Sequence, residues 1–205
     1  MEKKDNNPRT PERVLVRCPN WVGDVVMATP AFACLRRGFP EARITAAIRS
    51  YARPILADAP WFDEILTCDD KSWSGLRESV GAIRRESPDL AVLFPNSVRS
   101  WLVARVGGAT HITGYRRGIR RPFLDSGPVP PVTSKGGRAA VPMVAYYLGL
   151  CAGLGLPIED AQRPQLFVSE ELASWSEQYL AERGVKPGEP LIGLNPGAQF
   201  GSSKC

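Results

Sequence analysis

The chain has 205 residues, 43% of them hydrophobic and 23% charged, and its net charge is +5. This composition is ordinary for a globular protein. No apolar run approaches the ~20 residues that a helix needs to cross a bilayer, so we expect no membrane-spanning helix.

The cysteine and histidine content argues against several kinds of site. The five cysteines are scattered and form no Cys-x-x-Cys pair, which disfavours a disulfide framework and a zinc site and favours a reducing cytoplasm. The single histidine, His111, rules out a metal site built on a histidine pair. We therefore expect neither a metal nor a cofactor. Residues 1–12 are polar and lack an apolar signal core, so we expect a disordered tail there.

From residue 13 onward, strand-like apolar runs alternate with helical patterns. Strands are expected at 14–17, 43–48, 64–67, 90–94 and 111–114, and helices at 24–37, 51–57, 74–86, 97–106 and 140–154. This alternation predicts an α/β fold with a Rossmann-like, mainly parallel sheet and flanking helices. Pro30 inside the first helix predicts a kink or a new helix start after Thr29.

Two Gly/Pro-rich stretches interrupt this alternation. Residues 118–138 are rich in Gly, Pro and Arg and are expected to form a long loop. The stretch 155–164 predicts a domain boundary. Beyond it we expect a short strand at 165–168, a helix at 169–183 with Ser169 as its N-cap, and a strand at 191–194.

The expected domain organisation follows from this boundary. Residues 13–160 form an N-terminal Rossmann-like domain, and residues 161–205 form a linker with the first elements of a second α/β domain. The chain stops just where the next helix should begin. We therefore expect the second domain to be truncated in this sequence.

The segment from Arg13 to Pro30 carries the most information about function. An apolar run ends at Arg17, a short polar turn follows, and Asp24 opens a helical pattern. In an open parallel sheet, ligands bind at the carboxyl ends of the strands, so Asp24 stands where chemistry is usually done. A carboxylate at a helix N-terminus is stabilised in its charged form and can act as a general base toward a hydroxyl. It could equally cap the helix, and both roles can coexist.

Neighbouring side chains complete a candidate site. Trp21 lies beside Asn20 in the same turn, where its indole could stack on a sugar or only cover the sheet edge. Gly23 lets the backbone come close to a ligand. A further strand-to-helix turn at the same edge holds Asn96 and Ser97, which could face the cleft or only cap the next helix.

The last residues, NPGAQFGSSKC, contain another glycine-bearing turn. Backbone N–H groups at Gly197 and Gly201 could face an anion at a helix start, and Lys204 would add a positive charge to a phosphate. A plain surface turn is the alternative. Neither G-x-G-x-x-G after the first strand nor a P-loop motif is present, so the sequence predicts no dinucleotide fingerprint and no P-loop ATPase.

The basic run RRGIRR contains Arg116, Arg117, Arg120 and Arg121. It could be a solvated loop, or it could meet an anionic ligand or an anionic membrane surface. We expect no nucleic-acid partner, because no nucleic-acid motif is present and the aromatic residues are not interleaved with the basic ones.

Four segments together resemble one family. VRCPNWVGDVVMATPAF, LFPNSVRSWLVA, ITGYRRGIRR and IGLNPGAQFGSSKC, in this order, are similar to the ADP-heptose:lipopolysaccharide heptosyltransferases, most of all to the heptosyltransferase II type. The resemblance runs from about Arg13 to the last residue. It implies the GT-B architecture, in which an N-terminal domain holds the acceptor and a C-terminal domain holds the ADP-sugar across a cleft.

The resemblance also implies a mechanism. In an inverting single displacement, Asp24 would deprotonate a heptose hydroxyl of the lipid-linked Kdo/heptose lipopolysaccharide precursor while ADP leaves ADP-heptose. Lys204 would neutralise the donor phosphates, together with Gly197 and Gly201. The residues expected to bind the acceptor are Asn20, Trp21, Gly23, Asn96, Ser97 and Arg120. The protein would be cytoplasmic, with its arginine cluster meeting the acceptor or the inner membrane.

Most of the donor domain is missing from this sequence, so we expect the chain to have little or no activity alone. Two rival functions stay open at this point. One is another GT-B glycosyltransferase with a different sugar. The other is a non-catalytic module that binds an anionic saccharide or a membrane surface.

Overall fold

The computed structural model describes residues 10–134, 137, 139–158 and 163–194. The chain divides into two compact units, Met1–Phe167 and Val168–Cys205. In the second unit the described structure holds helix α5 (Glu170–Ala181). As expected, Ser169 caps this helix, because its hydroxyl accepts a hydrogen bond from the backbone N–H of Leu172.

The first unit is built on a five-stranded parallel sheet. Its strand order is β3-β2-β1-β4-β5. The strands are β1 (Arg13–Arg17), β2 (Arg43–Ile48), β3 (Glu64–Thr67), β4 (Leu90–Leu93) and β5 (His111–Gly114). All five strands expected between residues 13 and 114 are confirmed, with bounds that differ by one residue at most.

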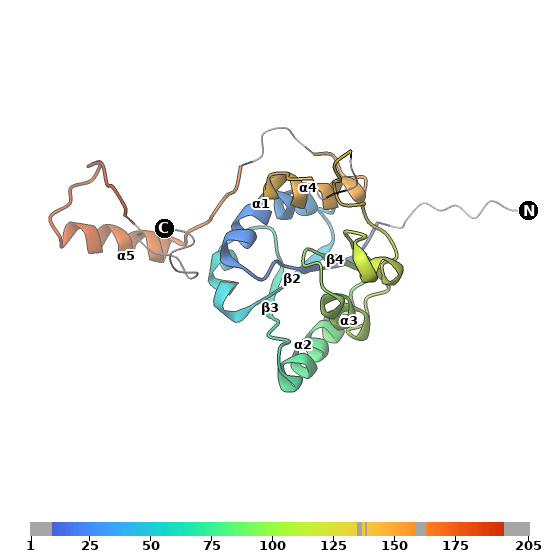
Figure 1. Cartoon of the computed structure of the whole chain (residues 1–205). Coiled ribbons are helices and arrows are strands. Elements are labelled where there is room, and N and C mark those ends of the chain that lie inside the picture. Colours follow the sequence, from blue (N-terminus) through green and yellow to red (C-terminus); the bar gives the residue numbers. More distant parts are fainter. Residues whose placement is uncertain (1–9, 135–136, 138, 159–162, 195–205) are drawn as a thin grey trace, which may run out of the picture. The chain divides into compact units, whose positions relative to one another are not determined.

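Helices cover both faces of this sheet, as Figure 1 shows. On one face α1 (Val22–Gly38) packs against α4 (Met143–Gly153), and on the other α2 (Trp73–Glu86) packs against α3 (Val98–Val106). Side chains alternate along β1: Val14 and Val16 join the core under α1 and α4, and Leu15 joins the core under α2 and α3. A sheet buried on both faces explains the continuous apolar runs of its strands. The predicted Rossmann-like α/β fold is confirmed.

The strand order reverses between β1 and β4. Strands β2 and β3 extend the sheet to one side of β1, and β4 and β5 extend it to the other. The last residues of the two central strands, Arg17 and Leu93, are partners in the register. In open α/β sheets the crevice at such a reversal, outside the carboxyl ends of the strands, is where ligands bind. The turns after β1 and β4 flank this crevice.

Helix α1 runs through Pro30 without a new start. Proline has no N–H, so the carbonyl of Val26, four residues earlier, loses its helical hydrogen bond. The Thr29 hydroxyl replaces the missing donor, at 2.8 Å from the Val26 oxygen. The same hydroxyl accepts a hydrogen bond from the Gln165 backbone N–H at 3.0 Å. Thr29 therefore keeps the helix continuous and ties it to the segment that follows α4.

Two segments form 3-10 helices where the sequence predicted an α-helix and a loop. The α-helix expected at 51–57 is the 3-10 helix η1 (Ser50–Leu56), a short segment that contains Pro54. The long loop expected at 118–138 opens with the 3-10 helix η2 (Gly118–Phe123). It returns to the sheet through a parallel bridge between Thr113 and Ser126.

The strands expected at 165–168 and 191–194 are wrong, since both segments lack regular structure. A strand needs a neighbour for its backbone hydrogen bonds, and no strand of the described residues pairs with either segment. Apolar runs of four residues are therefore not sufficient evidence for a strand.

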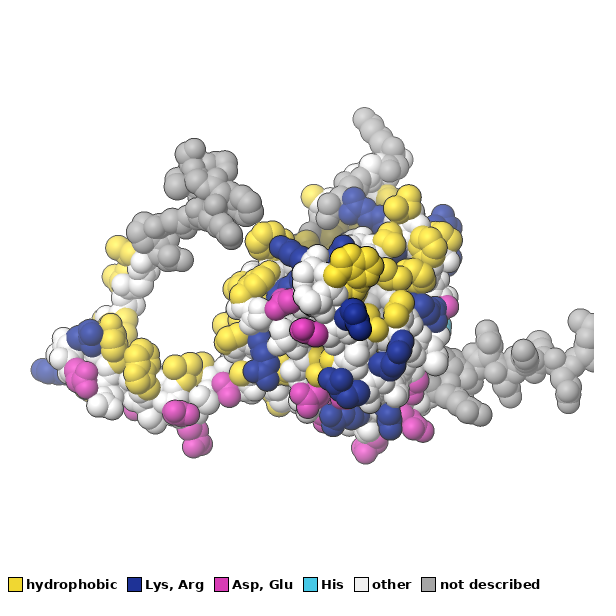
Figure 2. All heavy atoms as spheres, turned by 90° about the horizontal axis from the view of Figure 1, so that it is seen from below, with side chains coloured by type: hydrophobic (Ala, Val, Ile, Leu, Met, Phe, Trp, Pro, Cys, Tyr) yellow, Lys and Arg dark blue, Asp and Glu magenta, His cyan; other side chains and the backbone are white. Residues whose placement is uncertain are grey.

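The surface carries charges of both signs. Figure 2 looks onto the side of α2 and α3, where basic side chains lie among acidic ones and beside an apolar patch. The excess of positive charge is thus not gathered into one uninterrupted field on this face. Within the described part of the chain, no helix is both long enough and apolar enough to cross a membrane.

The bridging hydroxyl of Thr29 yields a stability prediction. Thr29→Val keeps the shape of the side chain but leaves the partly buried Val26 carbonyl without its replacement donor and the Gln165 N–H without its acceptor. An unsatisfied buried polar group costs about 1–3 kcal/mol, so we expect the free energy of unfolding in urea to fall by that amount at an unchanged m-value. Thr29→Ser retains the hydroxyl and should lose less. Equal stability of the valine variant and the parent would contradict this role.

Candidate active site

Asp24 lies in the first turn of α1, at the crevice beside the end of β1. The N-cap position is Trp21, whose side chain makes no capping hydrogen bond, so Asp24 lies inside the helix and is not its cap. The carboxylate is half-buried and sits at the positive end of the helix dipole. Of the two roles left open by the sequence, the capping role is wrong.

Tyr147 of α4 holds this carboxylate by a side-chain hydrogen bond. The ring is 5% exposed and packs on Phe94, with ring centroids 5.5 Å apart. Burial raises the pKa of Tyr147, and the negative charge of Asp24 raises it further. The phenol therefore stays protonated and donates to the carboxylate. Sequence reasoning missed Tyr147, although two adjacent tyrosines in the apolar pattern of 140–154 were a signal that this helix carries polar groups.

A second network joins the turn after β4 to the turn after β5. The Arg120 guanidinium donates to the backbone oxygens of Pro95 at 2.5 Å and Tyr115 at 2.9 Å, and to Asn96 Oδ1 at 3.1 Å. The Asn96 amide donates in turn to the Tyr146 hydroxyl at 2.9 Å. The Tyr146 ring stacks on Tyr115 with centroids 4.0 Å apart. These contacts fix the loops that border the crevice.

Arg120 is therefore a structural centre of the crevice wall. It is 1% exposed, and this burial lowers the pKa of its guanidinium. Every hydrogen bond that its Nη atoms make in the described structure goes to protein oxygens. The acceptor contact expected for Arg120 stays a prediction. Its neighbours Arg116 and Arg117 are exposed and line the cavity described below.

The other predicted acceptor residues lie in the turns that follow β1 and β4. Ser97 caps α3, because its hydroxyl accepts from the Ser100 N–H at 3.1 Å. At Gly23 the position of an added Cβ is open space. Trp21 is 53% exposed at the start of α1. The Asn20 side chain accepts from Arg17 at 3.4 Å, and its backbone oxygen accepts from the Tyr51 hydroxyl. The turn after β1 is thus held in place by its neighbours while Gly23 leaves room above it.

Buried ion pairs stabilise the carboxyl edge of the sheet on the side of β2 and β3. Asp70 pairs with Arg49 at 2.6 Å and with Arg17 at 3.7 Å, and all three side chains are nearly inaccessible. Arg17 also donates to the Ala47 carbonyl at 3.1 Å. The cluster ties the ends of β1 and β2 to the turn after β3. Its charges are already paired, so it is a structural element of the edge.

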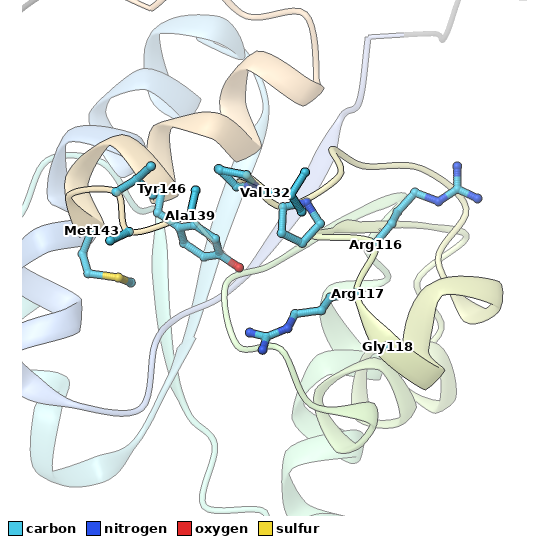
Figure 3. A pocket seen from close by; sticks show the side chains of 11 residues that line it. Arg116, Arg117, Gly118, Val132, Ala139, Met143 and Tyr146 are labelled. Atoms are coloured by element: carbon cyan, nitrogen blue, oxygen red, sulfur yellow. The ribbon is translucent and has the colours of Figure 1, made fainter. Parts of the chain in front are cut away.

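A cavity of about 570 Å³ opens beside the Arg120 network. Arg116 and Arg117, which lie between β5 and η2, line one part of it. The lining also contains Pro131, Val132, Met143 and Tyr146. Tyr146 lines this cavity, as Figure 3 shows, and the next residue of α4, Tyr147, contacts the Asp24 carboxylate.

The remaining predicted site residues give little geometry. Gly197, Gly201 and Lys204 lie outside the described residues. The ring of His111 hydrogen-bonds the Ser126 hydroxyl at 2.7 Å, away from the crevice at the end of β4. Within the described ranges, no group of three His, Cys, Asp or Glu side chains could hold a metal ion.

Known proteins resemble the chain in sequence. Lipopolysaccharide heptosyltransferase 2 of Escherichia coli (strain K12) is 28% identical over 199 residues, which are 94% of this chain and 56% of that protein. The chain thus spans about half the length of the curated relatives it matches. No protein-family model matches it.

Solved structures resemble the chain in fold. The E. coli ADP-heptose lipopolysaccharide heptosyltransferase II has a TM-score of 0.70 at 28% identity, over 92% of this chain and 56% of that one. A glycosyl transferase of family 9 from Veillonella parvula DSM 2008 has a TM-score of 0.77 at 23% identity, over 92% of this chain and 54% of that one. By sequence and by fold, the chain resembles the GT-B heptosyltransferases of lipopolysaccharide synthesis, over nearly all of its own length and about half of theirs.

Proposed function

We propose that this chain is the acceptor-binding part of a glycosyltransferase that adds heptose to the lipopolysaccharide inner core. The observation that carries the proposal is the position of Asp24. Asp24 follows the turn after β1, at the edge where the strand order reverses, its carboxylate is held by Tyr147, and the space above the adjacent Gly23 is open. The 28% identity to lipopolysaccharide heptosyltransferase 2 supports the choice of sugar.

In the proposed mechanism Asp24 is the general base. A heptose hydroxyl of the acceptor lies within hydrogen-bond reach of the carboxylate, which takes its proton as the oxygen attacks the anomeric carbon of the donor. The bond from the anomeric carbon to the phosphate oxygen breaks, and the diphosphate leaves with that electron pair. Attack from the face opposite the leaving group inverts the anomeric centre. The hydrogen bond from Tyr147 keeps the carboxylate aimed into the crevice.

The proposed donor is ADP-heptose, the sugar nucleotide in the name of the E. coli structure that is 28% identical. Its diphosphate would be neutralised by Lys204 and by the backbone N–H groups near Gly197 and Gly201. The proposed acceptor is the lipid-linked Kdo/heptose precursor. Because that acceptor is anchored in a membrane, the proposed place of action is the cytoplasmic face of the inner membrane.

The role of Asp24 gives the first functional prediction. Asp24→Asn keeps the size and the helix position but removes the base. In the two-domain protein that joins this chain to a donor-binding half, we expect heptose transfer to fall by about 10²- to 10⁴-fold. The measurement is ADP release in the presence of acceptor, with donor affinity measured separately by calorimetry.

The control for this variant is donor binding, which should stay at the parent value because the proposal assigns the donor phosphates to Lys204, Gly197 and Gly201. Transfer at the parent rate would remove Asp24 from the chemistry. Acceptor binding without any transfer by the parent two-domain protein would favour a non-catalytic binding module. Activity only with another nucleotide sugar would favour a different GT-B glycosyltransferase.

The Tyr147 hydrogen bond gives a prediction about the positioning of the base. Tyr147→Phe keeps the ring but removes the hydroxyl that meets the Asp24 carboxylate. A hydrogen bond contributes about 0.5–1.5 kcal/mol, so we expect kcat for heptose transfer in the two-domain protein to fall by about 2- to 12-fold while donor affinity stays unchanged. Tyr115→Phe removes another buried phenol, whose hydroxyl donates to the Tyr146 carbonyl at 2.6 Å, and serves as the matched control. Equal kcat in the parent and Tyr147→Phe would show that the bond does not position the base.

A further inference from the structure

Among the described residues, the cavity beside the Arg120 network is lined by hydrogen-bond donors and by no carboxylate. The polar side chains in its lining are Arg116, Arg117 and Tyr146. Neither of the two guanidinium groups has an ion-pair or hydrogen-bond partner among the described residues. The Tyr146 hydroxyl accepts from Asn96 at 2.9 Å, which leaves its own proton available to a ligand. A pocket with such a lining selects an anion.

The two arginines do not contribute equally. In Figure 3 the Arg117 side chain extends toward the space that the Tyr146 hydroxyl faces, whereas Arg116 extends away from it. Both residues are exposed, in contrast to the buried Arg120 of the same basic run. Arg117 and Tyr146 therefore form a pair of donors, a planar guanidinium and a phenol, that can bind one carboxylate or phosphate together.

The rest of the lining is apolar. Pro131, Val132 and Met143 give surfaces without charged or hydrogen-bonding side-chain groups. The volume of about 570 Å³ falls in the range of about 300–1,000 Å³ that is typical of small-molecule sites. An anionic group on an apolar or ring-shaped body fits this combination of donors and walls.

The position of the cavity connects it to the chemistry. Tyr146 lines it, and the next residue, Tyr147, holds Asp24. Tyr146 also accepts a hydrogen bond from Asn96, which lies in the turn after β4 at the reversal of the strand order. A saccharide anchored at Tyr146 by its anionic group could therefore extend toward the crevice in which the acceptor hydroxyl must lie.

We propose that this cavity binds the anionic group of the acceptor saccharide, a carboxylate or a phosphate, with Arg117 and Tyr146 as its ligands. The inference rests on the proposed function, because that function supplies the saccharide. It assigns the acceptor's anionic anchor to Arg117 and gives Arg120 the separate task of holding the wall.

The test uses the chain itself and methionine-methyl NMR. Met143 lines the cavity, whereas Met27 packs against the core under α1 and α4 and reports unspecific effects. The chain with ¹³C-labelled methionine methyl groups is titrated with glucuronic acid, glucose 6-phosphate and glucose. We expect a saturable shift of the Met143 methyl with at least one of the two anionic sugars, no such shift with glucose, and no shift of Met27. The anionic sugar that binds more tightly identifies carboxylate or phosphate as the preferred group.

Two variants and a control make the test specific. Arg117→Gln removes a charge-assisted hydrogen bond and should weaken the anionic sugar by about tenfold or more. Val132→Trp fills the cavity without changing the charge and should also abolish the shift. Arg121→Gln alters an exposed arginine of the same run that does not line the cavity, and should bind as the parent does.

Several results would overturn the inference. One is equal binding of glucose and the anionic sugars, and another is unchanged affinity in Arg117→Gln. A third is sedimentation with phosphatidylglycerol vesicles that depends on Arg117 while no sugar shifts Met143, which would make the arginines a membrane contact. Asp24→Asn should leave the titration unchanged, so a failure of this site and a failure of the proposed base are separate outcomes.

Discussion

The hydrogen bond between Tyr147 and Asp24 connects two parts of the chain that are more than 120 residues apart in sequence. It can form only because α4 packs on α1, on the same face of the sheet. The packing is supported by aromatic contacts, in which Phe94 lies between Phe32 of α1 and Tyr147 of α4, with centroids 5.1 and 5.5 Å away. The Cys151 thiol adds a contact to the Ala31 carbonyl at 3.5 Å. The position of the carboxylate in the crevice thus depends on the packing of α4 against α1.

Burial separates the arginines of one basic run into two roles. Arg120 exchanges its hydration for carbonyl and amide oxygens and thereby fixes the turns after β4 and β5. Arg116 and Arg117, a few residues earlier, keep exposed guanidinium groups at a cavity. The Nη atoms of Arg120 already donate to three protein oxygens, and its Nε, which has no partner among the described residues, is buried away from solvent. An exposed guanidinium keeps all its donors accessible to a ligand. Arginines that look alike in the sequence therefore differ in role: Arg120 holds the turns in place, and Arg117 is the one proposed to bind an anion.

Much of the first unit could be predicted from the sequence, because buried parallel strands are continuous apolar runs and helix ends carry distinct residues. The position of Asp24 after β1 followed from the same local pattern. Tyr147 could not be assigned to Asp24, since their contact depends on the packing of α4 and no local pattern records it. The burial of Arg120 was equally hidden, because its partners are backbone oxygens of Pro95 and Tyr115. The expected strands at 165–168 and 191–194 failed for the converse reason: local apolar character does not supply a pairing partner.

The central claim is that Asp24 faces the reacting hydroxyl of an acceptor held in the crevice at the carboxyl ends of β1 and β4. The most direct measurement is a crystal structure of the two-domain protein with a lipopolysaccharide-core acceptor bound. The account predicts an acceptor heptose hydroxyl within about 2.6–3.2 Å of an Asp24 carboxylate oxygen. An acceptor whose reacting hydroxyl lies against a different carboxylate, with Asp24 contacting only Tyr147, would contradict it.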